Sequence, residues 1–444
     1  MKRLLLVLCI VVVAVSVSAI DVGGYLENVT GIASPPVGVD SPLVLVERAS
    51  AALWLRQPLG GWELNGQGSY TYTPLVPLLF DLDELSLSGV FPASVAGASS
   101  IGMTFGRTNY SDPTGFILNH TLDGLKFTTS WPASAFSLAV GTTALVQKPT
   151  NGIVLSTLDV LDLADDDKRF APPRLIATVD FRTLEFLGGQ QLTLGAVIQE
   201  DLRPTDQLTA VGVTTAAPDA GGRLDTQHLV LGISGSLGPG FFYRTYYSFG
   251  SGRSLAFLAD ANSVTGYSYQ YAMILSHMAG AELSYYMPSV LNSRIRFSGL
   301  FSSGDADADS YLDGNTEGRS TAFVPLSPSS FSDVFTLQPG NSSHVGVSYS
   351  MRPIAGAGDV LQLELSAVSY LRTAGTGPVS APSVDPASDG TYVGTDIDLS
   401  VVAQPFSDLR LVLKGGVFLP NAAVMSTGNE DLDYEVTLQG VLRF

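Results

Sequence analysis

The chain has 444 residues and a formal net charge of −18, yet only 14% of its residues are charged. A protein this acidic is a poor partner for duplex nucleic acid, which is itself a polyanion, so nucleic-acid binding is excluded first. The single cysteine, Cys9, lies in the first apolar run, which excludes disulfides, thiol chemistry and thiolate metal sites from the rest of the chain.

The first 19 residues have the organisation of a secretory signal peptide. Lys2 and Arg3 precede an apolar run from Leu4 to Val15, and small residues up to Ala19 supply a cleavage site. This run is short for a spanning helix, so an N-terminal anchor is the less favoured alternative. We therefore predict a signal peptide over 1–19 and one domain over 20–444. Without Lys2 and Arg3 the net charge changes from −18 to −20.

Beyond the signal peptide the chain alternates apolar and polar residues in about 18 segments. A two-residue period is that of a strand with one apolar and one wet face. The predicted strands span 20–27, 43–56, 61–73, 80–91, 99–108, 119–130, 134–147, 173–186, 189–201, 226–237, 239–250, 269–287, 292–304, 342–352, 358–371, 391–404, 408–420 and 432–444. No apolar run after the signal peptide approaches 18 residues, which argues against a second spanning helix.

The connections between these strands are alternately short and long. Short ones are rich in proline and glycine, as at 58–61 and 238–240, whereas long ones at 148–172, 202–225, 251–268, 305–341 and 372–390 are polar. Alternation of short periplasmic turns with long outer loops is typical of outer-membrane barrels. The fold class predicted is therefore all-β: a transmembrane antiparallel up-and-down β-barrel of about 18 strands.

The last strand ends the chain on an aromatic residue. From Tyr434 to Phe444 one face carries Val436, Leu438 and Leu442, while the other carries Glu435 and Arg443. A final amphipathic strand with a C-terminal phenylalanine resembles the insertion signal of bacterial outer-membrane β-barrel proteins. The resemblance implies that Tyr434, Leu442 and Phe444 engage the barrel-assembly machinery, and that the barrel lies in outer-membrane lipid.

Two internal stretches extend the resemblance. The segment 106–112 followed by 123–125, and the segment 301–305 followed by 323–326, are similar to strand pairs of 18-stranded porins and of the alginate export family. The resemblance implies transport of small hydrophilic solutes or export of a polysaccharide. Alginate exporters carry a basic lumen, whereas this chain has only 23 lysines and arginines in all, which argues against polyuronate export.

An 18-stranded barrel is too wide for side chains to fill, so it leaves an aqueous lumen. Because charged side chains facing lipid at mid-membrane are costly, charges on the strands are expected to face this lumen. The basic residues placed there, near the periplasmic mouth, are Arg182, Arg244, Arg294, Arg296, Arg352, Arg410 and the slightly deeper Lys414. The inward acids are Glu364, Asp396, Asp398 and Glu435.

Two interpretations of the inward arginines stay open. As an unpaired ring they would favour anions by Coulomb attraction. As partners of the inward acids or of lipid headgroups they would select nothing.

The loop that begins at Asp305 places carboxylates at every second position: Asp305, Asp307, Asp309 and, further on, Asp313. This spacing predicts either a solvated acidic loop or a structural calcium site, since Ca²⁺ takes six to eight oxygen ligands. No other cofactor is indicated.

Catalysis finds little support, because the four histidines lie outside HExxH, GxSxG and P-loop patterns. We expect no enzyme. The leading prediction is an outer-membrane channel for small, anionic solutes or a polysaccharide. The alternatives are a surface adhesin or structural barrel with a plugged pore, and a soluble secreted β-protein.

Overall fold

The computed structural model describes residues 20–35, 43–93, 97–143, 152–183, 185–203, 224–264, 266–308, 311–312, 318–354 and 360–444. Eighteen strands are present: β1 Asp21–Ala33, β2 Val44–Leu59, β3 Trp62–Tyr72, β4 Leu79–Pro92, β5 Ser100–Ser111, β6 Asn119–Trp131, β7 Ser134–Thr142, β8 Arg174–Thr183, β9 Gln191–Asp201, β10 Leu224–Gly238, β11 Phe241–Ala259, β12 Tyr267–Met287, β13 Ser293–Ser302, β14 Ser342–Met351, β15 Leu361–Arg372, β16 Tyr392–Ala403, β17 Leu409–Pro420 and β18 Asp433–Arg443. Helix α3 spans Thr157–Ala164. None of the described helices is long and apolar enough to cross a bilayer.

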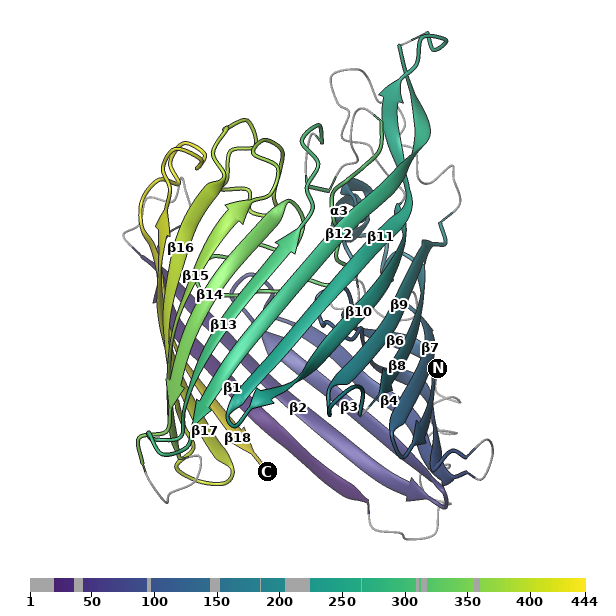
Figure 1. The fold of residues 1–444 in the computed structure, drawn as a ribbon, viewed down its shortest axis with the longest axis vertical. Helices are drawn as coiled ribbons and strands as arrows, with labels where there is room; N and C mark the ends of the chain where they lie inside the picture. Colours follow the sequence, from purple (N-terminus) through teal and green to yellow (C-terminus); the bar gives the residue numbers. More distant parts are fainter. Residues whose placement is uncertain are drawn as a thin grey trace.

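Each strand pairs with its neighbours in sequence, and β1 pairs with both β2 and β18. The sheet is therefore a closed antiparallel barrel, with short turns at the lower end of Figure 1 and long loops at the upper end. The predicted 18-stranded architecture is confirmed, and every predicted strand overlaps an observed one. The predicted signal peptide, 1–19, lies outside the described residues.

Three predicted boundaries are wrong. Strand β1 continues to Ala33 rather than ending at 27, and β7 ends at Thr142 rather than at 147. Strand β11 runs on to Ala259 through a stretch predicted as loop, and its ladder with β12 extends to the pair Ala259 and Tyr267. This hairpin rises above the other loops in Figure 1. A segment beyond the bilayer needs no apolar face toward lipid, so the alternation on which the prediction depended is missing there.

The two faces of the barrel wall follow the predicted alternation. On β15 to β18 the side chains of Leu365, Leu399, Leu413 and Leu438 are exposed. The residues before and after each of these leucines in the sequence face the inside of the barrel. An exposed apolar band on a closed barrel is the surface that lipid covers. The fold therefore places the protein in the bacterial outer membrane, as predicted.

The chain ends close the barrel wall. The backbone N–H of Phe444 donates to the Gly24 carbonyl at 3.0 Å, and the Gly24 N–H donates to the Phe444 carbonyl at 2.9 Å. The Phe444 side chain is exposed, as is that of Leu442 on the same outer face. Tyr434 is half-buried at the other end of β18. Their role in insertion stays a prediction.

The loop between β13 and β14 packs on the inside of the barrel wall. Phe335 of this loop stacks on Phe418 of β17 with ring centroids 4.0 Å apart and an interplanar angle of 4°. Phe418 is fully buried, and Val393 and Tyr370 belong to the same apolar cluster. Apolar burial therefore holds this loop inside the lumen.

Replacing Phe418 by alanine is expected to cost about 3–5 kcal/mol, because a buried aromatic leaves a cavity. Unfolding temperatures read from heat-modified gel mobility would show the loss. Phe406→Ala is the matched control, because the Phe406 side chain is 65% exposed in a short turn. Equal melting of the two variants would contradict the packing role.

Candidate solute pathway through the barrel

In the part of the chain that the structure describes, several loops enter the barrel, and one of them is the short segment 112–118 between β5 and β6. The Asp112 carboxylate accepts hydrogen bonds from the backbone N–H groups of Thr114 at 2.7 Å and Ile117 at 3.0 Å. These bonds fold the loop tightly on itself. Arg244 of β11 donates to the carbonyls of Pro113 and Thr114, which ties the loop to the far wall.

The second inward loop joins the first in the lumen. The N–H of Leu326 donates to the Ile117 carbonyl at 2.7 Å. The ring of Phe116 lies 5.3 Å from that of Phe331 and 5.7 Å from that of Tyr246. Loops from opposite sides of the barrel therefore meet in an aromatic contact, which narrows the passage.

The same loop is fastened to β16 and β17 by charged groups. The N–H of Phe335 donates to Asp396 at 2.7 Å, and Lys414 pairs with Asp333 at 2.7 Å. The N–H of Asp333 donates to Asp398 at 3.3 Å. Asp396, Asp398 and Lys414, predicted as lumen residues, thus hold the loop in place.

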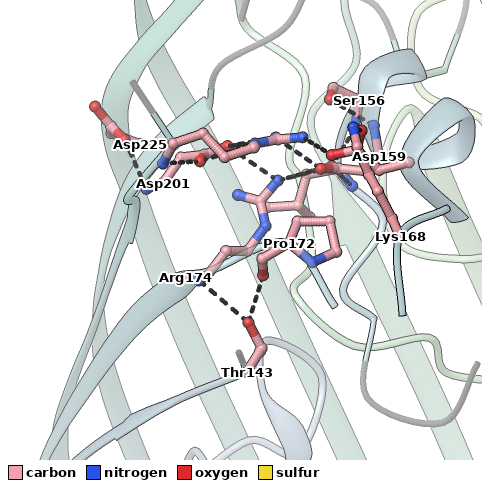
Figure 2. A network of polar contacts seen from close by, with 11 residues as sticks. Thr143, Ser156, Asp159, Lys168, Pro172, Arg174, Asp201 and Asp225 are labelled. Atoms are coloured by element: carbon pink, nitrogen blue, oxygen red, sulfur yellow. Dashed lines mark hydrogen bonds and ion pairs between the residues drawn. The ribbon is translucent and has the colours of Figure 1, made fainter. Parts of the chain in front are cut away.

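The third inward loop carries α3 and is anchored by the buried network in Figure 2. Arg174 of β8 donates to both oxygens of Asp159, at 2.8 and 2.7 Å, and neither side chain is exposed to solvent. Asp159 also accepts from the N–H groups of Leu155 and Ser156 at the start of α3. One carboxylate therefore both caps the helix and binds it to the wall.

Arg203, which follows β9, belongs to the same network. It donates to Asp159 at 2.8 Å, to Asp162 at 2.8 Å and to Asp201 at 3.0 Å. Burial opposes the charge of Arg203, but the bond to Asp201 and the charges of Asp159 and Asp201 outweigh it and hold its pKa above the ordinary value. The guanidinium is therefore a permanent cation in the anchor.

Between the first two loops and the wall lies a cleft of about 260 Å³. Its charged lining residues are Arg244, Arg296 and Glu282, and its aromatic ones include Phe116, Tyr246 and Phe331. The Arg244 guanidinium carbon lies 5.5 Å from the centre of the Tyr246 ring. The cleft therefore presents cations beside flat apolar surfaces. We call it the aromatic cleft.

A second cleft, of about 360 Å³, lies against β5 to β8. Lys126, Asp180 and Arg182 supply its charges, and Tyr110 and several hydroxyl side chains complete it. Among the described residues no carboxylate lies within ion-pair distance of Lys126. We call this the lysine cleft.

Six of the seven predicted basic residues, all except Arg352, lie at inner-face positions of the strands, and most of these six have partners. Arg182 is 3.6 Å from Asp180, Arg294 is 2.9 Å from Glu282 and Arg296 is 3.6 Å from Glu364. In the part of the chain that the structure describes, no acid pairs with Arg410. Arg352 directly follows β14, where its N–H donates to the Leu291 carbonyl.

Several inward acids were missed by the sequence reasoning. Glu282 and Asp180 lie on the inner face beside predicted arginines, and Asp333 reaches Lys414 only because its loop folds inward. Glu435, which was predicted, has Asp333 and Lys414 as its charged neighbours. Strand alternation marked Asp180 and Glu282, whereas no sequence signal marked Asp333.

The predicted calcium ligands are only partly described, because Asp309 and Asp313 lie outside the described residues. Asp305 accepts from the Thr321 N–H at 2.8 Å, and burial, followed by its bond to Asp307, raises the pKa of Asp305 to about 6. In the described residues, no group of three or more histidine, cysteine or carboxylate side chains is placed to hold a metal ion. The calcium site stays a prediction.

A closed 18-stranded antiparallel barrel with an apolar outer face, a charged inner face and inward loops has the architecture of outer-membrane porins. Three crystal structures of Pseudomonas aeruginosa proteins share it: OpdK, OccK8 (OprE), and OccK2 (OpdF) in complex with glucuronate. OpdK has a TM-score of 0.56 at 11% identity, with 96% of this chain and 99% of OpdK covered.

OccK8 has a TM-score of 0.56 at 11% identity and 96% and 98% coverage, and OccK2 has 0.54 at 12% and 96% of both chains. OpdK is also known with vanillate. At these identities the likeness shows the fold. No protein-family model and no curated protein sequence matches the chain. These structures support the 18-stranded porin part of the predicted resemblance and do not support its alginate export part.

Proposed function

We propose that this protein is a solute-selective diffusion channel that prefers small organic anions with a flat or cyclic body. The observation that carries the proposal is the aromatic cleft, where Arg244 and Arg296 stand beside the rings of Phe116, Tyr246 and Phe331. Guanidinium groups bind carboxylates through directed hydrogen bonds, and aromatic faces stack on flat solutes. The glucuronate and vanillate in the OccK2 and OpdK structures are anions of this kind.

The inward loops support small solutes rather than a polymer. The contact of Phe116 with Phe331 crosses the lumen, and Leu326 is hydrogen-bonded to Ile117 beside it. For a polysaccharide to pass, this contact would have to stay open while the whole length of the polymer moves through the lumen. Polysaccharide export therefore requires loop movement that passage of a monomer does not.

Refolded protein in planar bilayers tests the proposal through the reversal potential in a salt gradient. A potential that indicates anion preference, together with faster liposome swelling in glucuronate than in glucose, is expected. Liposome swelling in vanillate and in vanillyl alcohol compares an acid with a neutral solute in the same way for an aromatic ring. Cation preference with no advantage for the acids would refute the proposal, and folded barrels without conductance would favour a plugged adhesin.

A further inference from the structure

Strands β4 and β5 do not pair with each other over the whole height of the barrel wall. Both strands are described in full, yet their pairing covers only Leu85–Pro92 with Ser100–Arg107. Above this level, Leu79–Glu84 still pairs with β3, and Thr108–Ser111 still pairs with β6. The two halves of the wall therefore part on the side of the outer loops, and we call this gap the β4–β5 seam.

Backbone irregularities mark the level at which the seam begins. Strand β4 has a register shift opposite Gln67 and Gly68, which leaves Asp83 without an opposite residue. On β5, Gly106 has a φ of +107°, and a Cβ there would lie 2.3 Å from the Leu85 carbonyl oxygen. A β-bulge and a left-handed glycine bend their strands, so the divergence is built into the fold.

One side chain closes the seam. Arg107 is 2% exposed, and its Nε donates to the Leu82 carbonyl of β4 while Nη1 lies 3.0 Å from Asp123 of β6. Its Nη2 is 4.0 Å from Asp81, whose carboxylate accepts the Leu82 N–H at 2.8 Å. Side chains thus take the place of ladder bonds along the β4 edge.

The seam has an exposed apolar surface on its outer side, and on the inner side its β5 edge borders the lysine cleft, which no residue of β4 lines. Arg107 lies opposite Leu85 and two residues beyond Phe105, on the face that carries these exposed apolar side chains, and Leu78 and Phe80 extend that surface upward. On the inner side, Tyr110 and Ser111 of the diverging β5 segment line the lysine cleft. The buried Tyr110 hydroxyl has no hydrogen-bond partner in the described part of the chain.

We propose that the β4–β5 seam is a lateral opening through which amphipathic anions pass between the outer leaflet and the lumen, with Arg107 as its latch. Lys126, Arg182 and the Tyr110 hydroxyl offer the charge and hydrogen bond that an anionic headgroup needs, while Leu78, Phe80 and Leu82 match an alkyl chain. A latch made of polar bonds at an apolar surface can release, because an entering headgroup offers Arg107 another acceptor. This inference goes beyond the axial channel and does not depend on it.

Distances between spin labels in lipid nanodiscs test the latch. Labels at Glu84→Cys and Thr108→Cys span the first unpaired positions of the seam, and Ser88→Cys with Thr104→Cys is the matched control inside the ladder. No other cysteine interferes, because Cys9 lies in the predicted signal peptide. Dodecanoate is the amphipathic probe and gluconate is the control anion without an alkyl chain.

With the native Arg107 we expect one narrow distance across the seam. Dodecanoate, but not gluconate, should add a population longer by about one strand spacing, ~5 Å. Arg107→Met should show that population without ligand, and the control pair should stay unchanged throughout. Conductance of the same preparations reports the axial channel separately.

An 84–108 distance that stays unchanged with dodecanoate, in both the native and the Arg107→Met background, would overturn the proposal. Joint broadening of the seam and control pairs would also overturn it, because that indicates loss of the whole wall. If Arg107→Met does not fold, the protein with the native Arg107 still gives the answer: a longer 84–108 distance with dodecanoate supports the proposal, and an unchanged distance overturns it.

Discussion

Replacing Asp159 by alanine is expected to release the α3 loop from the wall and to raise single-channel conductance. Asp159 is fully buried and binds Arg174 and Arg203 while it caps α3. Removing one partner of a buried ion pair typically costs about 3–5 kcal/mol, because the remaining charge is left in a poor environment. The substitution removes the carboxylate that joins α3 to Arg174 and Arg203, so the loop should leave the lumen.

Conductance in planar bilayers measures the expected change, and limited proteolysis within 152–173 reports whether the loop is released. Lys168→Met is the matched control in the same loop, because Lys168 is 53% exposed and pairs with Asp162 at the surface. Exposed pairs contribute about 0–1 kcal/mol. Unchanged conductance and proteolysis in Asp159→Ala would show that the network does not hold the loop.

Replacing Arg296 by glutamine is expected to lower the preference of the channel for anions. The substitution removes one positive charge from the aromatic cleft and leaves Glu364 without its partner at 3.6 Å. Both side chains are more than one-third exposed, so the fold should be little affected. A change of about 1 kcal/mol in the energy of an anion at the cleft corresponds to a roughly five-fold change in permeability ratio.

The reversal potential in a salt gradient measures this ratio directly. Arg253→Gln serves as the control, because Arg253 pairs with Asp225 outside the cleft and is 54% exposed. It removes the same charge from the protein, so a shift confined to Arg296→Gln assigns selectivity to the cleft. Equal shifts in both variants would instead assign selectivity to net charge.

The aromatic contact of the two inward loops could not be foreseen from local patterns. Phe116 and Phe331 lie in segments without strand periodicity, and they meet only because Arg244 and Asp396 bind their loops. Loop paths depend on such long-range bonds, which leave no periodic trace in the sequence. Asp159 was missed for the same reason, although Ser156 followed by an acid at the third helical position is a recognisable capping box.

The inward positions of the arginines, by contrast, could be predicted. Arg294 and Arg296 alternate with Ile295 and Phe297, and this two-residue period assigns their face whatever the rest of the chain does. Their pairing could not be predicted in the same way. Glu282 reaches Arg294 through the register of β12 against β13, which the turn between these strands sets.

The barrel itself, its strand number and its inner and outer faces were determined by the sequence alone, because lipid outside and water inside impose an alternation on every strand. Closure follows, since an open sheet edge cannot be satisfied in a bilayer. Only the tertiary structure decided which charges are paired, where the lumen narrows, and that β4 and β5 part above Arg107. These features depend on contacts between segments far apart in the chain, whose energies no local pattern encodes.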